Sequence, residues 1–268
     1  NMASTKGAVI SLLAGHSTGA TSDGGDISIS GGTGTAEGGS VAIRSGTGAT
    51  AGNILIEAAA STTAASGEVH IRSANFPSTG VSGDVMLSTG TTADGDSGAI
   101  LIGTGLATGG NGGDIHITVG SGNSGVGGII TLEAGKTTKS DQNGGHVSVV
   151  AGEGGNRGGA VSILGGTGTT ASGGDVVLRS GSAATKSSGE IVIETAPTAD
   201  GASGALMFSS GASTSGASGT ITLQTGDASE EQAGDIIISV GTSTSGAGSD
   251  VFMTAGASTV AAGGSAAV

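Results

Sequence analysis

The amino-acid sequence predicts an all-β protein, a parallel β-solenoid of about 18 units of about fifteen residues that fill residues 1–268 as one continuous repeat domain. Three observations predict this fold: a repeat along the whole chain, two apolar residues separated by one position in each unit, and Gly-rich turns between units. Its 58 Gly but only 2 Pro exclude a collagen helix. Apolar residues at fixed spacing argue against a disordered chain.

The repeat unit opens on a Gly in nearly every copy, and positions are counted from that residue. In the unit Gly174–Ser188, the third and fifth positions are Val176 and Leu178, the seventh is small (Ser180) and the eighth is Gly181. The unit starts are Ala8, Gly25, Gly39, Gly52, Gly67, Gly83, Gly98, Gly113, Gly128, Gly145, Gly159, Gly174, Gly189, Gly204, Gly219, Gly234, Ser249 and Gly264. The spacing varies in the first half of the chain and becomes constant from Gly159 onward.

The third and fifth positions predict a short strand in each unit. From the unit at Gly25 to the unit at Ser249 the third residue is always Val, Ile or Leu, and the fifth is always apolar. Residues two apart share one face of a strand, and β-branched side chains favour that conformation. A turn rich in Gly, Ser and Thr then leads to the next unit. An antiparallel meander is the alternative fold, but it would favour tight Asn-Gly hairpins, which the turns lack.

The second position indicates how many strands form one coil. In alternate units it is usually Asp or Asn, as in Asp26, Asn53, Asp84, Asp114, Asp175 and Asp235. In the interleaved units only Asp250 is of this kind. This modulation predicts two strands, or thirty residues, per coil, with the aliphatic side chains packed between two parallel sheets. A triangular coil of one unit remains the alternative.

The chain shows no polar cap at either end, since it starts within a partial unit and stops part-way through another. Because open strand edges pair with other chains, the sequence predicts end-to-end association with further copies. A lateral contact is also expected, because the outward-facing fourth position is often apolar and exposed apolar stripes mark interfaces. The residues expected in that contact are Leu55, Met86, Val177, Met207 and Ile237.

A column of acidic and imidazole side chains follows from a thirty-residue coil. Its members are Asp84, Asp114, His116, His146 and Asp175. Such groups one strand spacing apart could hold Ca²⁺ or another divalent cation. The alternative is that an Asp after Gly hydrogen-bonds its own turn. No other cofactor is expected.

Threonines recur in the turns and would form a hydroxyl array suited to O-glycans or to polysaccharide. They are Thr33, Thr35, Thr167, Thr169, Thr170, Thr214, Thr242 and Thr244. The alternative is that Ser and Thr are simply good turn formers.

Catalysis is not expected. Gly15-His16-Ser17-Thr18-Gly19 matches the GxSxG pattern, but no helix is predicted after it, and such a match arises easily in a chain rich in Gly and Ser. The formal net charge of −13 argues against nucleic acid as a partner, and no apolar run is long enough for membrane insertion.

Units such as Gly-Gly-Asp175-Val-Val-Leu-Arg-Ser-Gly and Ser-Gly-Asp84-Val-Met-Leu-Ser-Thr-Gly resemble Gly/Ser/Thr-rich repetitive surface or adhesive proteins of diatoms and other microalgae. More loosely, they resemble bacterial β-solenoid adhesins. The resemblance implies an extracellular or cell-surface structural role. The sequence thus predicts a structural protein of an extracellular fibre, sheath or adhesin. An ice-binding solenoid and a carbohydrate-binding surface module are the alternatives.

Overall fold

The computed structural model describes residues 7–19, 21–61, 63–76 and 80–267. Within these ranges the chain forms no helix and no β-strand. The prediction of an all-β fold with a parallel β-solenoid is therefore wrong for the single chain, and so is the prediction of two paired strands per coil. The prediction of uncapped ends concerns, among others, residues 1–6 and 268, which lie outside the described residues.

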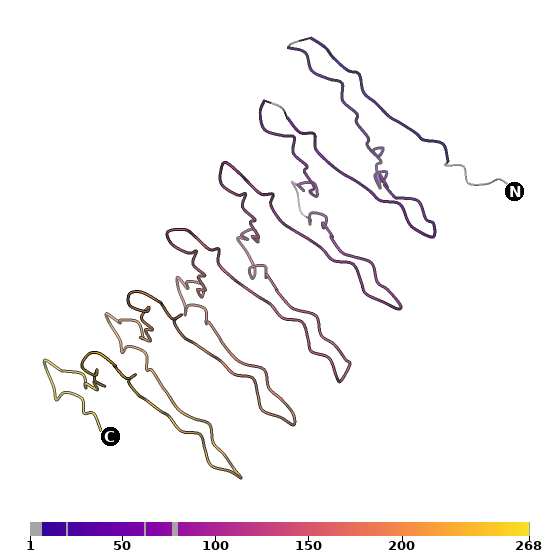
Figure 1. The fold of residues 1–268 in the computed structure, drawn as a ribbon. Helices are drawn as coiled ribbons and strands as arrows, with labels where there is room; N and C mark the ends of the chain where they lie inside the picture. The colour runs from indigo at the N-terminus through magenta and orange to yellow at the C-terminus, as the bar shows by residue number, and fades with distance from the viewer. Residues whose placement is uncertain (1–6, 20, 62, 77–79, 268) are drawn as a thin grey trace. The chain divides into compact units, whose positions relative to one another are not determined.

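The backbone is irregular, and it repeatedly runs out and back between turns (Figure 1). Contacts within the chain group its residues into two compact parts, Asn1–Thr131 and Leu132–Val268, each of which contains many repeat units. We use the word arm for the apolar stretch at positions two to six of each repeat unit; bends recur between the arms, as at residues 155–157, 184–186 and 244–246. The sequence period therefore appears as an alternation of arms and turns.

Strands do not form because the arms lack backbone partners. A β-ladder needs a second backbone about 4.8 Å away along the hydrogen-bonding direction. Among the described residues, the backbone hydrogen bonds join only residues in or beside the turns. Residues twelve or more positions apart rarely bring their Cα atoms within 8 Å of each other. Successive arms therefore form no β-ladder among the described residues, which contradicts the stacked coils that the repeat predicts.

A hydrophobic core is also missing from the described part of the chain, where no side chain is buried. The total accessible surface is 26604 Å². A folded monomer of 24.5 kDa would expose about 10,000 Å², and its fully unfolded chain about 36,000 Å². The single chain therefore leaves exposed about three quarters of the surface that it has when unfolded.

The third position of an arm is less exposed than the fourth despite the missing core, and the fifth lies between them, as at Val176, Val177 and Leu178 (61%, 74% and 70%). Third-position side chains are half-exposed, at 46% for Ile191 and 61% for Val176, whereas Met86 at a fourth position is 86% exposed. Side-chain pairs two residues apart agree with this pattern. Glu68 Oε2 lies 2.6 Å from His70 Nε2, which places the second and fourth positions on one side of the arm. The arms have the side-chain geometry of strands without the pairing.

Candidate functional site

The junction between consecutive units is the most protected part of the chain. The partly buried small residues at the seventh position are Ala14, Ala58, Ser73, Ala134, Ala151, Ser180 and Ala255. Each faces the Gly that opens the next unit. A Cβ atom added to Gly67 would lie 3.3 Å from the Cβ of Ala58, and one added to Gly145 would lie 3.3 Å from the Cβ of Ala134. A side chain at these two opening positions would crowd the seventh residue, so Gly favours the close approach across the junction.

A backbone hydrogen bond closes many of these junctions. The opening Gly donates its N–H to the carbonyl of the eighth residue, as from Gly159 to Gly152 at 2.9 Å and from Gly145 to Gly135 at 2.8 Å. Every junction closed in this way has Ala, Ser or Gly at the seventh position. The junctions that follow Thr89 and Thr195 carry no such bond. The bond is also missing after the small residues Ser73 and Ser210, so a β-branched seventh residue accompanies its loss without being the only cause.

The tenth position of the unit closes the turn through its side chain. Ser213 Oγ accepts a hydrogen bond from Gly216 N–H at 3.1 Å, and Ser243 Oγ accepts one from Gly246 N–H at 3.0 Å. Ser258 does the same for Ala261 at 2.9 Å. Hydroxyl groups commonly satisfy turn backbone in this way. Sequence reasoning missed this position, although a Ser or Thr recurring at the tenth place was a signal that could have revealed it.

Two turns share the sequence Thr-Ala-Asp-Gly and the same geometry. Thr198 Oγ1 donates to the carbonyl of Asp200 at 2.8 Å, and Gly201 follows with a φ of 91°. Thr92 Oγ1 donates to the Asp94 carbonyl at 3.0 Å, and the next residue also has a positive φ. Only Gly adopts this backbone conformation without strain. Identical short sequences therefore form identical turns, independent of any tertiary packing.

Where the tenth residue is Gly, the turn closes without a hydroxyl. A Cβ atom added to Gly34 would overlap the carbonyl oxygen of Glu37, and one added to Gly154 would overlap that of Arg157. The missing side chain leaves room for the carbonyl of the residue three positions on. The tenth position thus often holds a hydroxyl that bonds the turn or a Gly that lets the backbone approach, although other units have Ala there, as at Ala107, Ala183 and Ala228.

The threonines predicted as a hydroxyl array occupy other turn positions, at the ninth, eleventh and twelfth places. All eight are exposed: Thr33, Thr35, Thr167, Thr169, Thr170, Thr214, Thr242 and Thr244. Around Ser243, for example, Thr242 and Thr244 make no hydrogen bond to another described residue, whereas Ser243 closes the turn. The turn therefore divides its hydroxyl groups into one that is used internally and others that face solvent.

The predicted metal-binding residues do not come together in the single chain. Of Asp84, Asp114, His116, His146 and Asp175, the structure pairs only Asp114 with His116, at 3.7 Å between Oδ2 and Nε2. No group of three acidic, His or Cys side chains in the described ranges is arranged to hold a metal ion. The predicted site required coils of thirty residues stacked on one another, and the described residues do not form such coils. Binding of Ca²⁺ or another divalent cation therefore remains a prediction.

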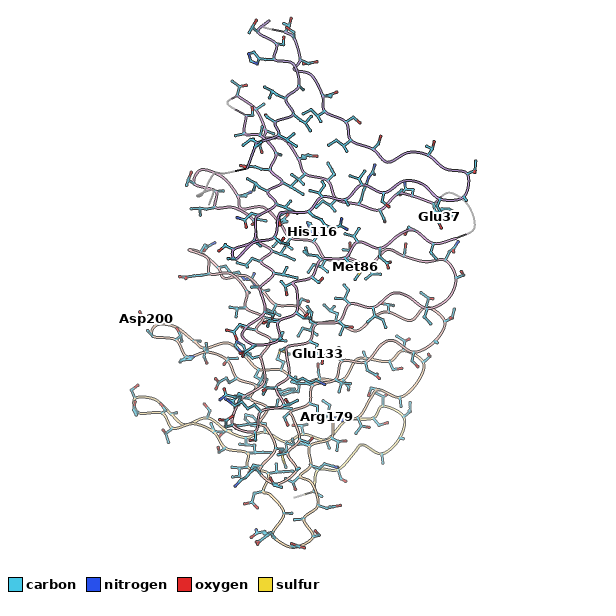
Figure 2. All side chains as sticks on the ribbon, turned by 90° about the vertical axis from the view of Figure 1, so that its right-hand side faces the viewer. Glu37, Met86, His116, Glu133, Arg179 and Asp200 are labelled. Carbon is cyan, nitrogen blue, oxygen red and sulfur yellow. The ribbon has the colours of Figure 1, made fainter. Side chains whose placement is uncertain are left out.

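The predicted lateral residues all lie on the surface. Leu55, Met86, Val177, Met207 and Ile237 are exposed, from 74% for Val177 to 86% for Met86. Figure 2 shows Met86 projecting from its arm, among side chains that extend from the backbone without an enclosing layer. The interleaved units expose fourth-position residues equally, as at Leu101 and Phe252. Both sets are therefore available for contact.

Concave sites are missing from the described residues, where no pocket opens. None of these residues forms a helix long and apolar enough to cross a membrane. The features that could act are thus the exposed apolar arms, their unpaired backbone and the turn hydroxyls. Comparison of the chain with protein-family models, with curated proteins and with solved structures gives no match.

Proposed function

We propose that the chain is a structural protein of an extracellular fibre, sheath or adhesin, and that it acts by associating with its own copies. The observation that carries the proposal is the exposure of the aliphatic repeat. Ile100 and Leu101, for example, remain 48% and 88% exposed. Exposed apolar surface of this extent marks an interaction surface.

The composition supports association rather than a permanently solvated coil. Chains that stay unfolded combine few apolar residues with high charge, whereas this chain has 35% hydrophobic and 11% charged residues. Because each unit repeats the same apolar pair, every unit can bury its apolar side chains in the same kind of contact with another chain. A role based on repetition needs no catalytic group. Lateral association follows from the arms, and end-to-end association remains a prediction from the sequence.

Sedimentation velocity of the full chain at increasing protein concentration tests the proposal, with electron microscopy of the same samples. We expect a rise in sedimentation coefficient and elongated particles. A chain that stays monomeric at every concentration up to its solubility limit would refute self-association.

A matched pair of variants tests which apolar row makes the lateral contact. The first variant changes Leu55, Met86 and Met207 to Ser, and the second changes Leu101, Val192 and Phe252 to Ser. We expect the first to raise the protein concentration needed for association more than the second. Equal effects would show that the two rows contribute alike and would contradict the predicted lateral surface.

Carbohydrate binding is a second candidate, supported by the turn hydroxyls that face solvent. The hydroxyls of Thr242 and Thr244 are free for hydrogen bonds to a sugar, since Ser243 alone closes that turn. Binding of the monomeric chain to immobilised polysaccharide, compared with a variant in which both threonines are changed to Val, tests this role. Undiminished binding of the variant would exclude these hydroxyls from it.

A further inference from the structure

Among the described residues, the backbone groups of the arms have no backbone hydrogen-bond partner. In the arm that contains Val176, Val177 and Leu178, no backbone N–H or C=O takes part in a hydrogen bond with another described backbone group. The same holds for the arm around Ile236, Ile237 and Ile238. A row of unpaired groups on an extended segment is a template for pairing with another segment. Burial of the adjacent aliphatic side chains requires this pairing, because an unpaired buried backbone group is costly.

The amount of exposed surface shows what kind of partner fits. The chain exposes about 16,000 Å² more than a folded monomer of its mass. One partner in a standard protein interface buries about 800 Å², so one such patch would cover only about a twentieth of this excess. The partner must therefore follow the whole length of the chain, arm by arm.

A second copy of the chain has the matching spacing. From Gly25 the unit starts advance unevenly through Gly39, Gly52, Gly67 and Gly83, and only from Gly159 onward is the spacing constant. A copy placed without offset aligns every arm with an arm and every turn with an identical turn. A copy displaced by one unit would set turns of unequal length beside each other in the first half of the chain. The uneven spacing thus favours a single register, and the reversed direction would not match it.

We propose that a second copy of this chain pairs with the arms in parallel and in register, so that residues at positions two to six become strands only between chains. The inference rests on the proposed self-association and names its geometry. It requires no β-solenoid within one chain. In-register pairing places each residue about 4.8 Å from the same residue of the next copy. Identical turns, such as the one closed by Ser243, then lie beside each other.

The net charge of −13 opposes this arrangement and makes it salt-dependent. In register, Asp114 of one copy lies beside Asp114 of the next, and like charges opposite each other are destabilising. The acidic residues are exposed, so dissolved salt screens their repulsion.

Spin labels test the register directly, because the chain has no Cys and one introduced Cys gives one label. We choose Ala42→Cys in the unevenly spaced half and Thr222→Cys in the evenly spaced half, both at exposed fourth positions. In-register pairing stacks identical labels within about 5 Å of each other. We expect spin exchange to collapse the three-line spectrum into one line as the chain associates, with a rise of β-structure in the infrared amide I band.

Dilution with chains that carry a diamagnetic label is the control, and it should restore the three-line spectrum. Association with a three-line or merely broadened spectrum at Ala42→Cys would overturn the in-register pairing and leave the proposed function intact. Association without a rise of β-structure would also overturn it. If no association occurs at any concentration, the proposed function fails together with this inference.

Discussion

The hydroxyl at the tenth position provides a local test of how the repeat builds its turns. Ser243 accepts the N–H of Gly246 at 3.0 Å, and its neighbour Thr242 makes no hydrogen bond to the described chain. Replacing Ser243 by Ala removes the acceptor and leaves the backbone unchanged. Replacing Thr242 by Val removes a hydroxyl from the same turn with no bond to lose. The two variants therefore separate a structural hydroxyl from a solvent-facing one.

The expected magnitude is that of one neutral, exposed hydrogen bond. Such a bond contributes a net 0.5–1.5 kcal/mol, and exposure places this one near the lower end, at about 0.5–1 kcal/mol. The turn should therefore open about two to five times more often in Ser243→Ala. The residues of this turn are exposed in the described structure, so the effect should stay local.

Amide hydrogen exchange at Gly246, followed by nuclear magnetic resonance at a concentration below association, measures this opening. We expect the exchange rate of Gly246 to rise about two- to fivefold in Ser243→Ala and to stay unchanged in Thr242→Val. The equivalent turn offers a repeat of the experiment, since Ser213 accepts the N–H of Gly216 at 3.1 Å. An equal rise in both variants, or none in Ser243→Ala, would refute the role of the tenth position.

Four further predictions concern the junction, the turn backbone, the charge and the cation. Ala151→Thr should weaken the hydrogen bond between Gly159 N–H and the Gly152 carbonyl and raise the amide hydrogen-exchange rate of Gly159 about two- to tenfold. The control Ala160→Thr, on the arm, should leave this rate unchanged. An unchanged rate in Ala151→Thr would contradict the link between β-branching and opening of the junction. Gly201→Ala should destabilise its turn by about 1–2 kcal/mol, because Gly201 has a positive φ that Ala adopts only with strain. Chemical shifts of the turn residues measure this effect, with Gly211→Ala as the control, since an added Cβ there meets nothing within 4 Å. Equal chemical-shift changes in the two variants would argue against the positive φ as the cause. Raising NaCl from about 50 mM to about 500 mM should lower the protein concentration needed for association, as seen by sedimentation, and the opposite trend would rule out repulsion as the opposing force. Calorimetric titration of the monomeric chain with Ca²⁺ should give affinities within about twofold for the parent and Asp114→Asn, because one exposed carboxylate beside one imidazole supplies too few oxygen ligands for this ion. A tenfold loss would reveal a site that the described residues of the single chain do not display.

The local structure of each unit could be predicted from the sequence, because it depends on residues close together in the chain. Apolar residues at the third and fifth positions predict an extended segment with two unlike faces, and Ile100 and Leu101 show this difference in exposure. Gly and hydroxyl residues predict turns at the observed places, because these residues satisfy or relax turn backbone by themselves. The role of the tenth position was within reach of the same reasoning.

The candidate site was predicted less well, because its members are far apart in sequence. Asp114 and His116 meet because they lie two residues apart on one arm. Asp84, His146 and Asp175 could join them only through stacked coils, and the single chain does not stack. The exposure of the outward fourth position was expected in both sets of units, and Leu101 and Phe252 are exposed like Met86.

The sequence by itself determined the period, the direction of each side chain along an arm, and the turn that ends it. These properties follow from backbone sterics and hydrogen bonds within about fifteen residues. Only the tertiary structure showed that the arms do not pair within the described part of one chain. Pairing depends on the distance in space between arms, and these arms are separated by many residues along the sequence. The same absence of internal partners leaves the aliphatic repeat available to another copy.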